Sequence, residues 1–171
     1  QEVSTVAQVP LMENLPKGFM AVPPGRRSFK WRNDQPASLI FVMALDEGNP
    51  DTVVPFRDEV FQLEAPFNEI PRSMLKTQNR FSSIVWGNKN LAIVYDYWWN
   101  TRNKKTYLFN PALPEGGVDL LFDQNYQDAY NDPGSFITRK NKLGQKVLAL
   151  KGSRAYLKGD GFSDEGQFPF L

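Results

Sequence analysis

Short apolar runs separated by turn-forming residues follow one another along the whole chain. Thirteen prolines and twelve glycines are spread through its 171 residues, so few ten-residue windows lack a helix breaker. The runs between them are rich in β-branched and aromatic residues, which favour strands. The pattern predicts strands over Ser28–Arg32, Ser38–Leu45, Glu59–Glu64, Phe81–Trp86, Leu91–Trp98, Thr106–Asn110, Val118–Asp123, Ser135–Arg139 and Lys146–Leu150, with a further strand near Arg72–Thr77.

One arrangement of strand, polar turn and apolar strand recurs along the sequence. Trp31-Arg-Asn-Asp-Gln-Pro leads into an apolar run, and Trp86-Gly-Asn-Lys-Asn leads into another 55 residues later. A weaker third copy spans residues 138–150, where Arg139 is the counterpart of Trp86 at a spacing of 53. A repeat of roughly fifty residues with this content is typical of four-stranded propeller blades.

This pattern predicts an all-β fold in the form of a partial β-propeller, with about two complete four-stranded blades plus flanking partial blades. All of residues 1–171 are expected to belong to one propeller domain. Its blades are residues 25–79 and 80–133, preceded by the end of a blade in 1–24 and followed by the start of another in 134–171. Propellers are usually closed rings of four to eight blades, so we expect a longer polypeptide, or self-association through exposed blade faces.

The candidate core lies in the strands with apolar residues at both alternating sets of positions. Ser38–Leu45 has this pattern, which predicts burial on both faces. Large aromatic side chains carry much of the apolar area that stacked blades bury, so we expect Trp31, Trp86 and Trp98 in the core between blades. The aromatic run that ends at Trp99 is also expected to stack on a neighbouring blade, with a platform for a sugar or peptide as the alternative.

Charge and composition exclude several classes of function. Lys and Arg number 20 against 19 Asp and Glu, mixed along the chain, so we expect neither nucleic acid nor a membrane as partner. No apolar run approaches the roughly 18–20 residues of a membrane-spanning helix. The chain has no cysteine and no histidine, so it cannot build a Ser-His-Asp triad, a thiolate site or a histidine-based zinc site.

The acidic segment Asp46-Glu-Gly-Asn-Pro-Asp51 does not have the spacing of a calcium-binding loop, and we expect it to be a solvated loop. We therefore expect no catalytic residues, no metal site and no cofactor. The chain begins at Gln1 without a basic and apolar signal segment. Any targeting signal is expected to have been removed or to lie upstream, and a periplasmic or secreted location is the working hypothesis.

Seven motifs in fixed order carry a family resemblance that covers essentially residues 5–171. They are Gly25-Arg-Arg-Ser-Phe-Lys-Trp-Arg-Asn-Asp-Gln-Pro-Ala, Ala44-Leu-Asp-Glu-Gly-Asn-Pro, Arg57-Asp-Glu-Val-Phe, Arg80-Phe-Ser-Ser-Ile-Val-Trp-Gly, Tyr97-Trp-Trp-Asn-Thr-Arg, Leu120-Leu-Phe-Asp and Tyr130-Asn-Asp-Pro-Gly-Ser. In this order and spacing they resemble the propeller domain of the glutamyl endopeptidase branch of the prolyl oligopeptidase family of serine peptidases.

The resemblance implies a two-part enzyme, in which an N-terminal propeller caps a C-terminal α/β-hydrolase domain with a Gly-x-Ser-x-Gly elbow. Gly152-Ser-Arg is not such an elbow, so the chain alone is expected to be inactive. Its role would be to gate peptide substrates on their way to the hydrolase domain of the same parent chain. A preference for glutamate calls for cationic partners, and the candidate gating residues are Arg26, Arg27, Arg32, Trp99 and Arg102.

Other interpretations of these residues stay open at this point. Arg32 and Arg102 have nearby acids in Asp34 and Asp96, and ion pairing or packing over aromatic rings is the structural alternative to ligand binding. At the level of the whole chain, the alternatives are a free-standing module that binds protein or glycan and an unrelated β-sandwich carbohydrate-binding domain.

Overall fold

The first sheet contains four consecutive antiparallel strands in the computed structural model, which describes residues 5–8 and 10–171. In the order β1-β2-β3-β4, they are Arg27–Trp31, Ser38–Ala44, Asp58–Glu64 and Arg72–Thr77. The segment 10–26 precedes them and includes the short 3-10 helix η1, Met12–Asn14. Of the residues assigned to a preceding blade, 1–4 and 9 lie outside the described residues.

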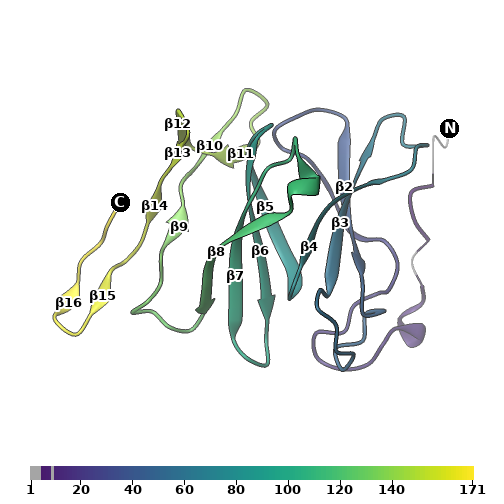
Figure 1. Ribbon diagram of the computed structural model, residues 1–171, viewed down its shortest axis with the longest axis horizontal. Helices are drawn as coiled ribbons and strands as arrows, with labels where there is room; N and C mark the ends of the chain where they lie inside the picture. The colour runs from purple at the N-terminus through teal and green to yellow at the C-terminus, as the bar shows by residue number, and fades with distance from the viewer. Residues whose placement is uncertain (1–4, 9) are drawn as a thin grey trace.

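The second sheet repeats this up-and-down order. Its strands β5-β6-β7-β8 are Arg80–Asn88, Leu91–Trp98, Asn103–Phe109 and Val118–Asn125, and the 3-10 helix η2, Pro114–Gly116, lies between the last two. The two sheets follow each other along the long axis of the molecule (Figure 1). The prediction of an all-β chain with two complete four-stranded units is confirmed.

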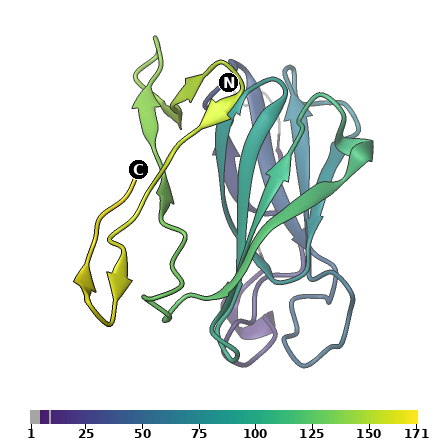
Figure 2. The same ribbon diagram turned by 60° about the vertical axis from the view of Figure 1, so that its left-hand side comes forward.

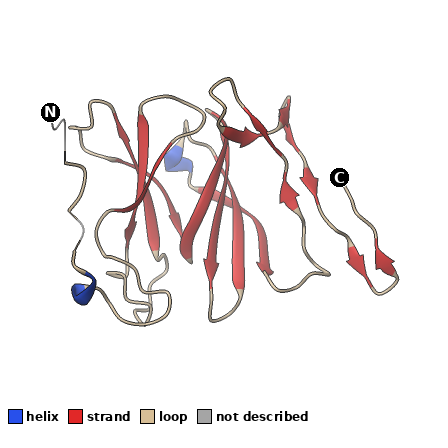
Figure 3. Ribbon diagram, turned by 180° about the vertical axis from the view of Figure 1, so that it is seen from behind, coloured by secondary structure: helices blue, strands red, loops and turns tan. Residues whose placement is uncertain are grey.

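The C-terminal part consists of short strand pairs. These are β10–β11, β12–β13, β9–β14 and β15–β16, with the bounds Ser135–Phe136 (β9), Thr138–Lys140 (β10), Lys146–Leu148 (β11), Leu150–Lys151 (β12), Arg154–Ala155 (β13), Leu157–Lys158 (β14), Phe162–Ser163 (β15) and Gly166–Gln167 (β16). The β15–β16 hairpin projects away from both four-stranded sheets (Figures 2 and 3). Within the described residues, no helix has the length and apolar content needed to cross a membrane.

Two predicted strands in this part are interrupted. Ser135–Arg139 is divided into β9 and β10, and Lys146–Leu150 into β11 and β12. The first interruption falls at Ile137 and the second at Ala149. The N–H of Ile137 donates to the carbonyl of Tyr156, while the carbonyl of Ile137 accepts from the N–H of Ala149. Because one residue bonds to two different neighbouring segments, neither ladder continues through it.

The main core lies between the two sheets. Ile40 and Val42 of β2 pack with Trp86 of β5 and Val94 of β6 in one buried cluster. The intervening Phe41 points to the other face of β2, where its ring stacks on that of Phe61 at 5.4 Å. Burial of β2 on both faces is thus confirmed for residues 38–42.

The other face of the second sheet is covered by the hairpin of β10 and β11, which belongs to the third copy of the sequence repeat. Ile93 is fully buried there, as is Leu148 of β11, and Val147 of the same strand is buried; β11 lies against β5. The turn of this hairpin is joined to the turn between β1 and β2. Asn33 Nδ2 donates to the carbonyl of Lys146 at 3.0 Å, and Asn141 Nδ2 donates to the carbonyl of Asn33 at 2.7 Å. The turns of the first and third sequence repeats therefore lie together.

The three tryptophans expected in the core have different surroundings. Trp86 is 2% exposed, as predicted, whereas Trp31 is 57% exposed and that prediction is wrong. Trp31 ends the edge strand β1, and its ring meets Phe67 edge-on at 5.7 Å rather than entering the core between the sheets. Trp98 is half-buried, with the guanidinium carbon of Arg57 3.9 Å from its ring centroid.

Candidate functional site

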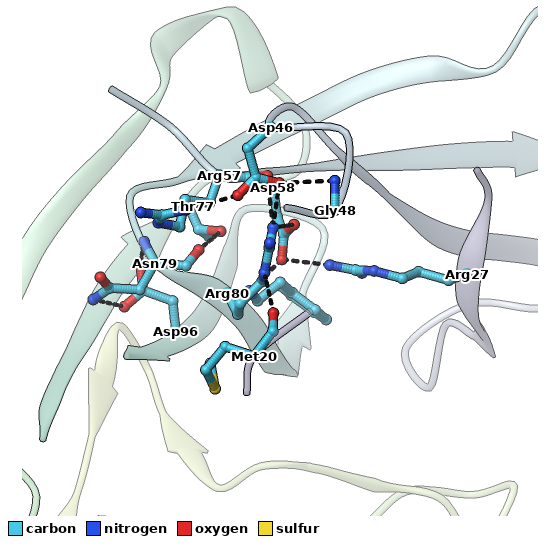
Figure 4. Close-up of polar contacts among 11 residues, drawn as sticks. Met20, Arg27, Asp46, Gly48, Arg57, Asp58, Thr77, Asn79, Arg80 and Asp96 are labelled. Atoms are coloured by element: carbon cyan, nitrogen blue, oxygen red, sulfur yellow. Dashed lines mark hydrogen bonds and ion pairs between the residues drawn. The ribbon is translucent and has the colours of Figure 1, made fainter. Parts of the chain in front are cut away.

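A buried arginine joins the two sheets at one end (Figure 4). Arg80 is the first residue of β5 and is 3% exposed. Its Nη1 donates to Oδ1 of Asp46 at 2.7 Å and to Oδ1 of Asp58 at 3.1 Å, and its Nε donates to the carbonyl of Met20 at 3.1 Å. One guanidinium therefore binds the first sheet, the loop after β2 and the N-terminal segment together.

Two further arginines complete a buried ion network around the same carboxylates. Arg27 Nη2 lies 2.6 Å from Oδ2 of Asp58, and Arg57 Nη1 lies 2.7 Å from Oδ2 of Asp46. Asp46 Oδ1 also accepts a hydrogen bond from the N–H of Gly48 at 3.0 Å. The expectation of a solvated acidic loop is therefore wrong for Asp46, which is 1% exposed, although Glu47 and Asp51 are exposed. Asp46 can be buried because its ion pairs with Arg57 and Arg80 offset the free-energy cost of removing a carboxylate from water.

The network forms because of where the strands begin and end. Arg27, Asp58 and Arg80 are the first residues of β1, β3 and β5, while Asp46 follows β2 and Arg57 precedes β3. In antiparallel sheets of consecutive strands, these positions all lie at the same end. Arg27 and Arg80, which are 53 positions apart in the sequence, thereby both contact the carboxylate of Asp58.

A second buried polar cluster lies within the second sheet. Asp96 of β6 accepts hydrogen bonds from the N–H and Nδ2 of Asn79, both at 3.0 Å, from the N–H of Lys105 at 3.2 Å and from Tyr107 Oη at 2.8 Å. Burial raises the pKa of the Asp96 carboxyl, while these hydrogen bonds oppose the rise. Burial, together with the nearby Asp96, also raises the pKa of the Tyr107 phenol.

A cavity of about 830 Å³ opens beside both clusters. Its lining includes Arg27 and Arg80 of the ion network, Asp96 of the second cluster, the segment 19–23, and Tyr95, Tyr97, Trp99, Lys104 and Tyr126. Burial raises the pKa of Tyr95 to about 12. At the rim, the rings of Phe19 and Trp99 are 5.0 Å apart. The guanidinium carbon of Arg102 lies 3.9 Å from the Trp99 ring centroid, an arrangement that favours cation–π attraction.

Of the five candidate gating residues, Arg27 and Trp99 line this cavity. Arg102 is not among the lining residues, but its guanidinium group stacks on the ring of Trp99. Arg26 lies elsewhere: its Nη1 donates to the carbonyl of Val6 at 3.0 Å, and its guanidinium carbon is 4.8 Å from the Phe41 ring centroid.

Arg32 is also away from the cavity and is buried. Its Nε and Nη2 bond to both carboxylate oxygens of Asp34, at 3.0 and 2.7 Å, and its Nη1 donates to Gln62 Oε1 at 2.6 Å. Its guanidinium carbon lies 4.0 Å from the Trp86 ring centroid. The contacts therefore match the structural alternative for both residues. Arg32 pairs with Asp34, whereas Arg102 does not pair with Asp96 but packs over the ring of Trp99 and donates to the Trp99 carbonyl.

Sequence reasoning did not select the residues with the densest contacts in the site, Arg80, Asp58, Asp46 and Asp96. The first three each lie within a motif that carries the family resemblance, namely Arg80-Phe-Ser-Ser, Arg57-Asp-Glu-Val-Phe and Ala44-Leu-Asp-Glu-Gly-Asn-Pro. The sequence signal that could have identified these three residues is a charged residue that lies both in a family motif and at the end of a predicted strand. In the buried network each of the two carboxylates is paired with two arginines, and the chain has no histidine to act as a base.

The molecule is thus an all-β chain of two consecutive four-stranded sheets with a cationic cavity at one end. It is similar to probable chloroplastic glutamyl endopeptidases of plants. The protein of Oryza sativa subsp. japonica is 34% identical over 176 residues, covering 99% of this chain and 19% of that protein. The protein of Arabidopsis thaliana is 32% identical over 177 residues, covering 99% of this chain and 18% of that protein.

The chain spans about a fifth of the length of the curated relatives that it matches. No protein-family model matches the sequence, and no solved structure matches it.

Proposed function

We propose that this chain is a non-catalytic propeller portion of a glutamyl-endopeptidase-like serine peptidase of the prolyl oligopeptidase family. In the parent protein, it gates the access of peptide substrates to a separate α/β-hydrolase domain. The observation that carries the proposal is the similarity to glutamyl endopeptidases over 99% of the chain and only 18–19% of their length. A segment of that size leaves room for a second, catalytic domain.

The arrangement of the sheets supports the propeller part of the proposal. Each sheet is a meander of four consecutive strands, and apolar residues of both pack into one core between them. Stacked four-stranded meanders are the building units of propellers. We assign residues 25–79 and 80–133 to two adjacent blades, 134–171 to the start of the next and 1–24 to the end of the preceding one.

The rim of the cavity supports the gating part. Trp99 is 41% exposed and Phe19 is 65% exposed, so both aromatic rings are accessible to an extended peptide. Arg102 stacks on Trp99 and adds a positive charge at the same rim. We assign the gating contact to Trp99 and Arg102, and a supporting role to Arg26, Arg27 and Arg32, whose guanidinium groups already bond to other protein groups.

The test uses the parent peptidase and two Glu-containing substrates, a short peptide and a long unfolded polypeptide. Trp99→Ala and Arg102→Ala are expected to change the ratio of kcat/KM for the two substrates by about threefold or more, since access and not chemistry is altered. Trp31→Ala is the matched control, because Trp31 is an exposed tryptophan that does not line the cavity. Equal ratios in all variants would contradict the gating role, and a parent without peptidase activity would contradict the whole proposal.

The second candidate is a free-standing module that binds protein or glycan. It is favoured by the exposed aromatic side chains of the C-terminal hairpin region, Phe162, Phe168 and Phe170. A reading frame that stops soon after Leu171, together with a monodisperse 171-residue protein, would establish this alternative in place of the peptidase.

A further inference from the structure

Two edge strands each place a serine in the wall of the cavity of about 830 Å³. β1 and β5 are each at the edge of their sheet, and each has a β-bulge close to its first residue. Ser82 falls in the bulge of β5, and Ser28 falls in that of β1, where its φ is +56°. Bulges at sheet edges redirect side chains and are frequent beside functional sites. Both serines are exposed, so the cavity wall carries two accessible hydroxyl groups.

The charged groups of the same wall are already engaged by other protein groups. Arg27 and Arg80 form ion pairs within the buried network. Asp96 accepts four hydrogen bonds, and Lys104 packs over an aromatic ring. The two serine hydroxyls, in contrast, have no hydrogen-bond partner among the described residues. A hydroxyl both donates and accepts, so the wall offers hydrogen bonds that suit the N–H and C=O groups of a peptide backbone.

Aromatic rings form the apolar part of the lining. Phe19, Tyr97 and Trp99 are 65%, 37% and 41% exposed, and the rings of Phe19 and Trp99 are 5.0 Å apart. Burial raises the pKa of Tyr95 to about 12, as a wall of low polarity requires. Partly exposed rings around a concave site favour a further ring, because aromatic pairs attract at centroid distances of about 4.5–7 Å.

We propose that this cavity binds a neutral stretch of an extended peptide that contains an aromatic side chain. The side chain packs against Phe19, Tyr97 and Trp99, and the peptide backbone bonds to the hydroxyls of Ser28 and Ser82. A volume of about 830 Å³ is in the range of ligand cavities, roughly 300–1,000 Å³, which are mostly apolar with a few polar groups. The inference rests on the proposed function, for which it names the class of substrate: unfolded segments, which expose aromatic rings and backbone groups together.

The test titrates the 171-residue chain with three capped peptides, acetyl-Gly-Phe-Gly-amide and its counterparts with Ala or Glu in the centre. Backbone amide signals of Phe19, Ser82 and Tyr97 are followed by NMR. The Phe peptide is expected to give saturable shifts in the millimolar range and to bind about tenfold more tightly than the Ala peptide, since the ring adds most of the buried apolar area. The Glu peptide is expected to bind no better than the Ala peptide. No cleavage is measured, so failure of this binding is distinguishable from failure of the gating assay with the parent peptidase.

Variants separate the contribution of the rings from that of the hydroxyls. Phe19→Ala removes a mostly exposed ring, so the core is kept and binding of the Phe peptide alone is expected to weaken about three- to tenfold. Ser82→Ala is expected to weaken the Phe and Ala peptides by the same factor of about two to five, because the backbone is common to both. Trp31→Ala is the matched control, since Trp31 is an exposed tryptophan that pairs with Phe67 and does not line the cavity.

Three results would overturn the proposal. The first is equal affinity for the Phe and Ala peptides, or no saturable shift with either. The second is unchanged binding of the Phe peptide to Phe19→Ala, which would place that peptide elsewhere on the surface. The third is saturation by maltotriose and by none of the peptides, which would assign the cavity to a glycan.

Discussion

Nη1 of Arg80 lies 2.7 Å from Oδ1 of Asp46, and both side chains are almost completely removed from solvent. Arg80 begins the second sheet, while Asp46 follows the second strand of the first. This buried ion pair therefore connects the two sheets directly, at the end of the molecule where the cavity opens.

Replacement of the arginine is expected to be strongly destabilising. Arg80→Met leaves the carboxylates of Asp46 and Asp58 buried with one cation fewer, and the loss of one partner from a buried ion pair costs about 3–5 kcal/mol. The measurement is the free energy of unfolding from urea titrations.

Arg72→Met is the control for the loss of an arginine as such. Arg72 is more than half exposed and lies 3.8 Å from Glu115, so its replacement is expected to cost less than about 1 kcal/mol. Equal losses in the two variants would show that the buried network does not hold the sheets together.

The two tryptophans at equivalent positions of the sequence repeat make a matched pair. Trp86→Ala is expected to cost about 3–5 kcal/mol, because Trp86 is buried in the core between the sheets and also carries Arg32 on its ring face. Trp31→Ala is expected to cost less than half as much, since most of Trp31 is exposed. Thermal or urea unfolding of both variants measures the difference, and a larger loss for Trp31 would contradict the packing described.

Gly48 tests the close approach between the acidic loop and the N-terminal segment. Its φ is +77°, and a Cβ atom there would lie 1.9 Å from the carbonyl oxygen of Val22, whose N–H donates to the Gly48 carbonyl at 3.1 Å. Gly144 has a similar φ of +74° but open space around it. Gly144→Ala is expected to cost about 1–2 kcal/mol from the left-handed backbone alone, and Gly48→Ala clearly more. Equal melting temperatures for the two variants would contradict this contact.

Asp96 provides a prediction about pH. Burial raises its pKa above the ordinary value of 3.8, so the folded chain keeps this proton to a higher pH than the unfolded chain. The corresponding stabilisation is fully present below pH 3.8 and is lost as the pH rises through the folded-state pKa.

Asp96→Asn cannot titrate and shows no such loss. The stability of the unaltered chain minus that of the variant is therefore expected to fall as the pH rises from about 4 to 7, measured by urea unfolding at several pH values. A difference that stays constant or grows over this range would contradict the raised pKa.

The strands were predictable from the sequence because their signal is local. Alternating apolar residues and Pro- or Gly-containing turns specify a strand within a few positions, and β2, β3 and β6 lie where the pattern indicated. The pairing of Arg32 with Asp34, two residues apart, is equally local and was foreseen as an alternative. Where a strand depends on changing neighbours, as at Ile137, the local pattern failed.

The site was not predictable in the same way, because it depends on contacts between distant residues. Asp46 was expected to be solvated, since nothing near it in sequence shows that Arg80 will meet its carboxylate. Trp31 and Trp86 occupy equivalent positions of the repeat, yet only Trp86 has a second sheet against it. Burial of a charge or a ring at a strand end is decided by which other strand ends lie beside it.

The most direct test of the proposed identity compares two preparations on one substrate. The 171-residue chain and the protein encoded by its complete reading frame are incubated with a peptide that contains a single glutamate, and the products are identified by mass spectrometry. The proposal predicts cleavage after glutamate by the complete protein and none by the chain alone. Cleavage by the chain alone, or a complete protein that leaves the peptide intact, would contradict it.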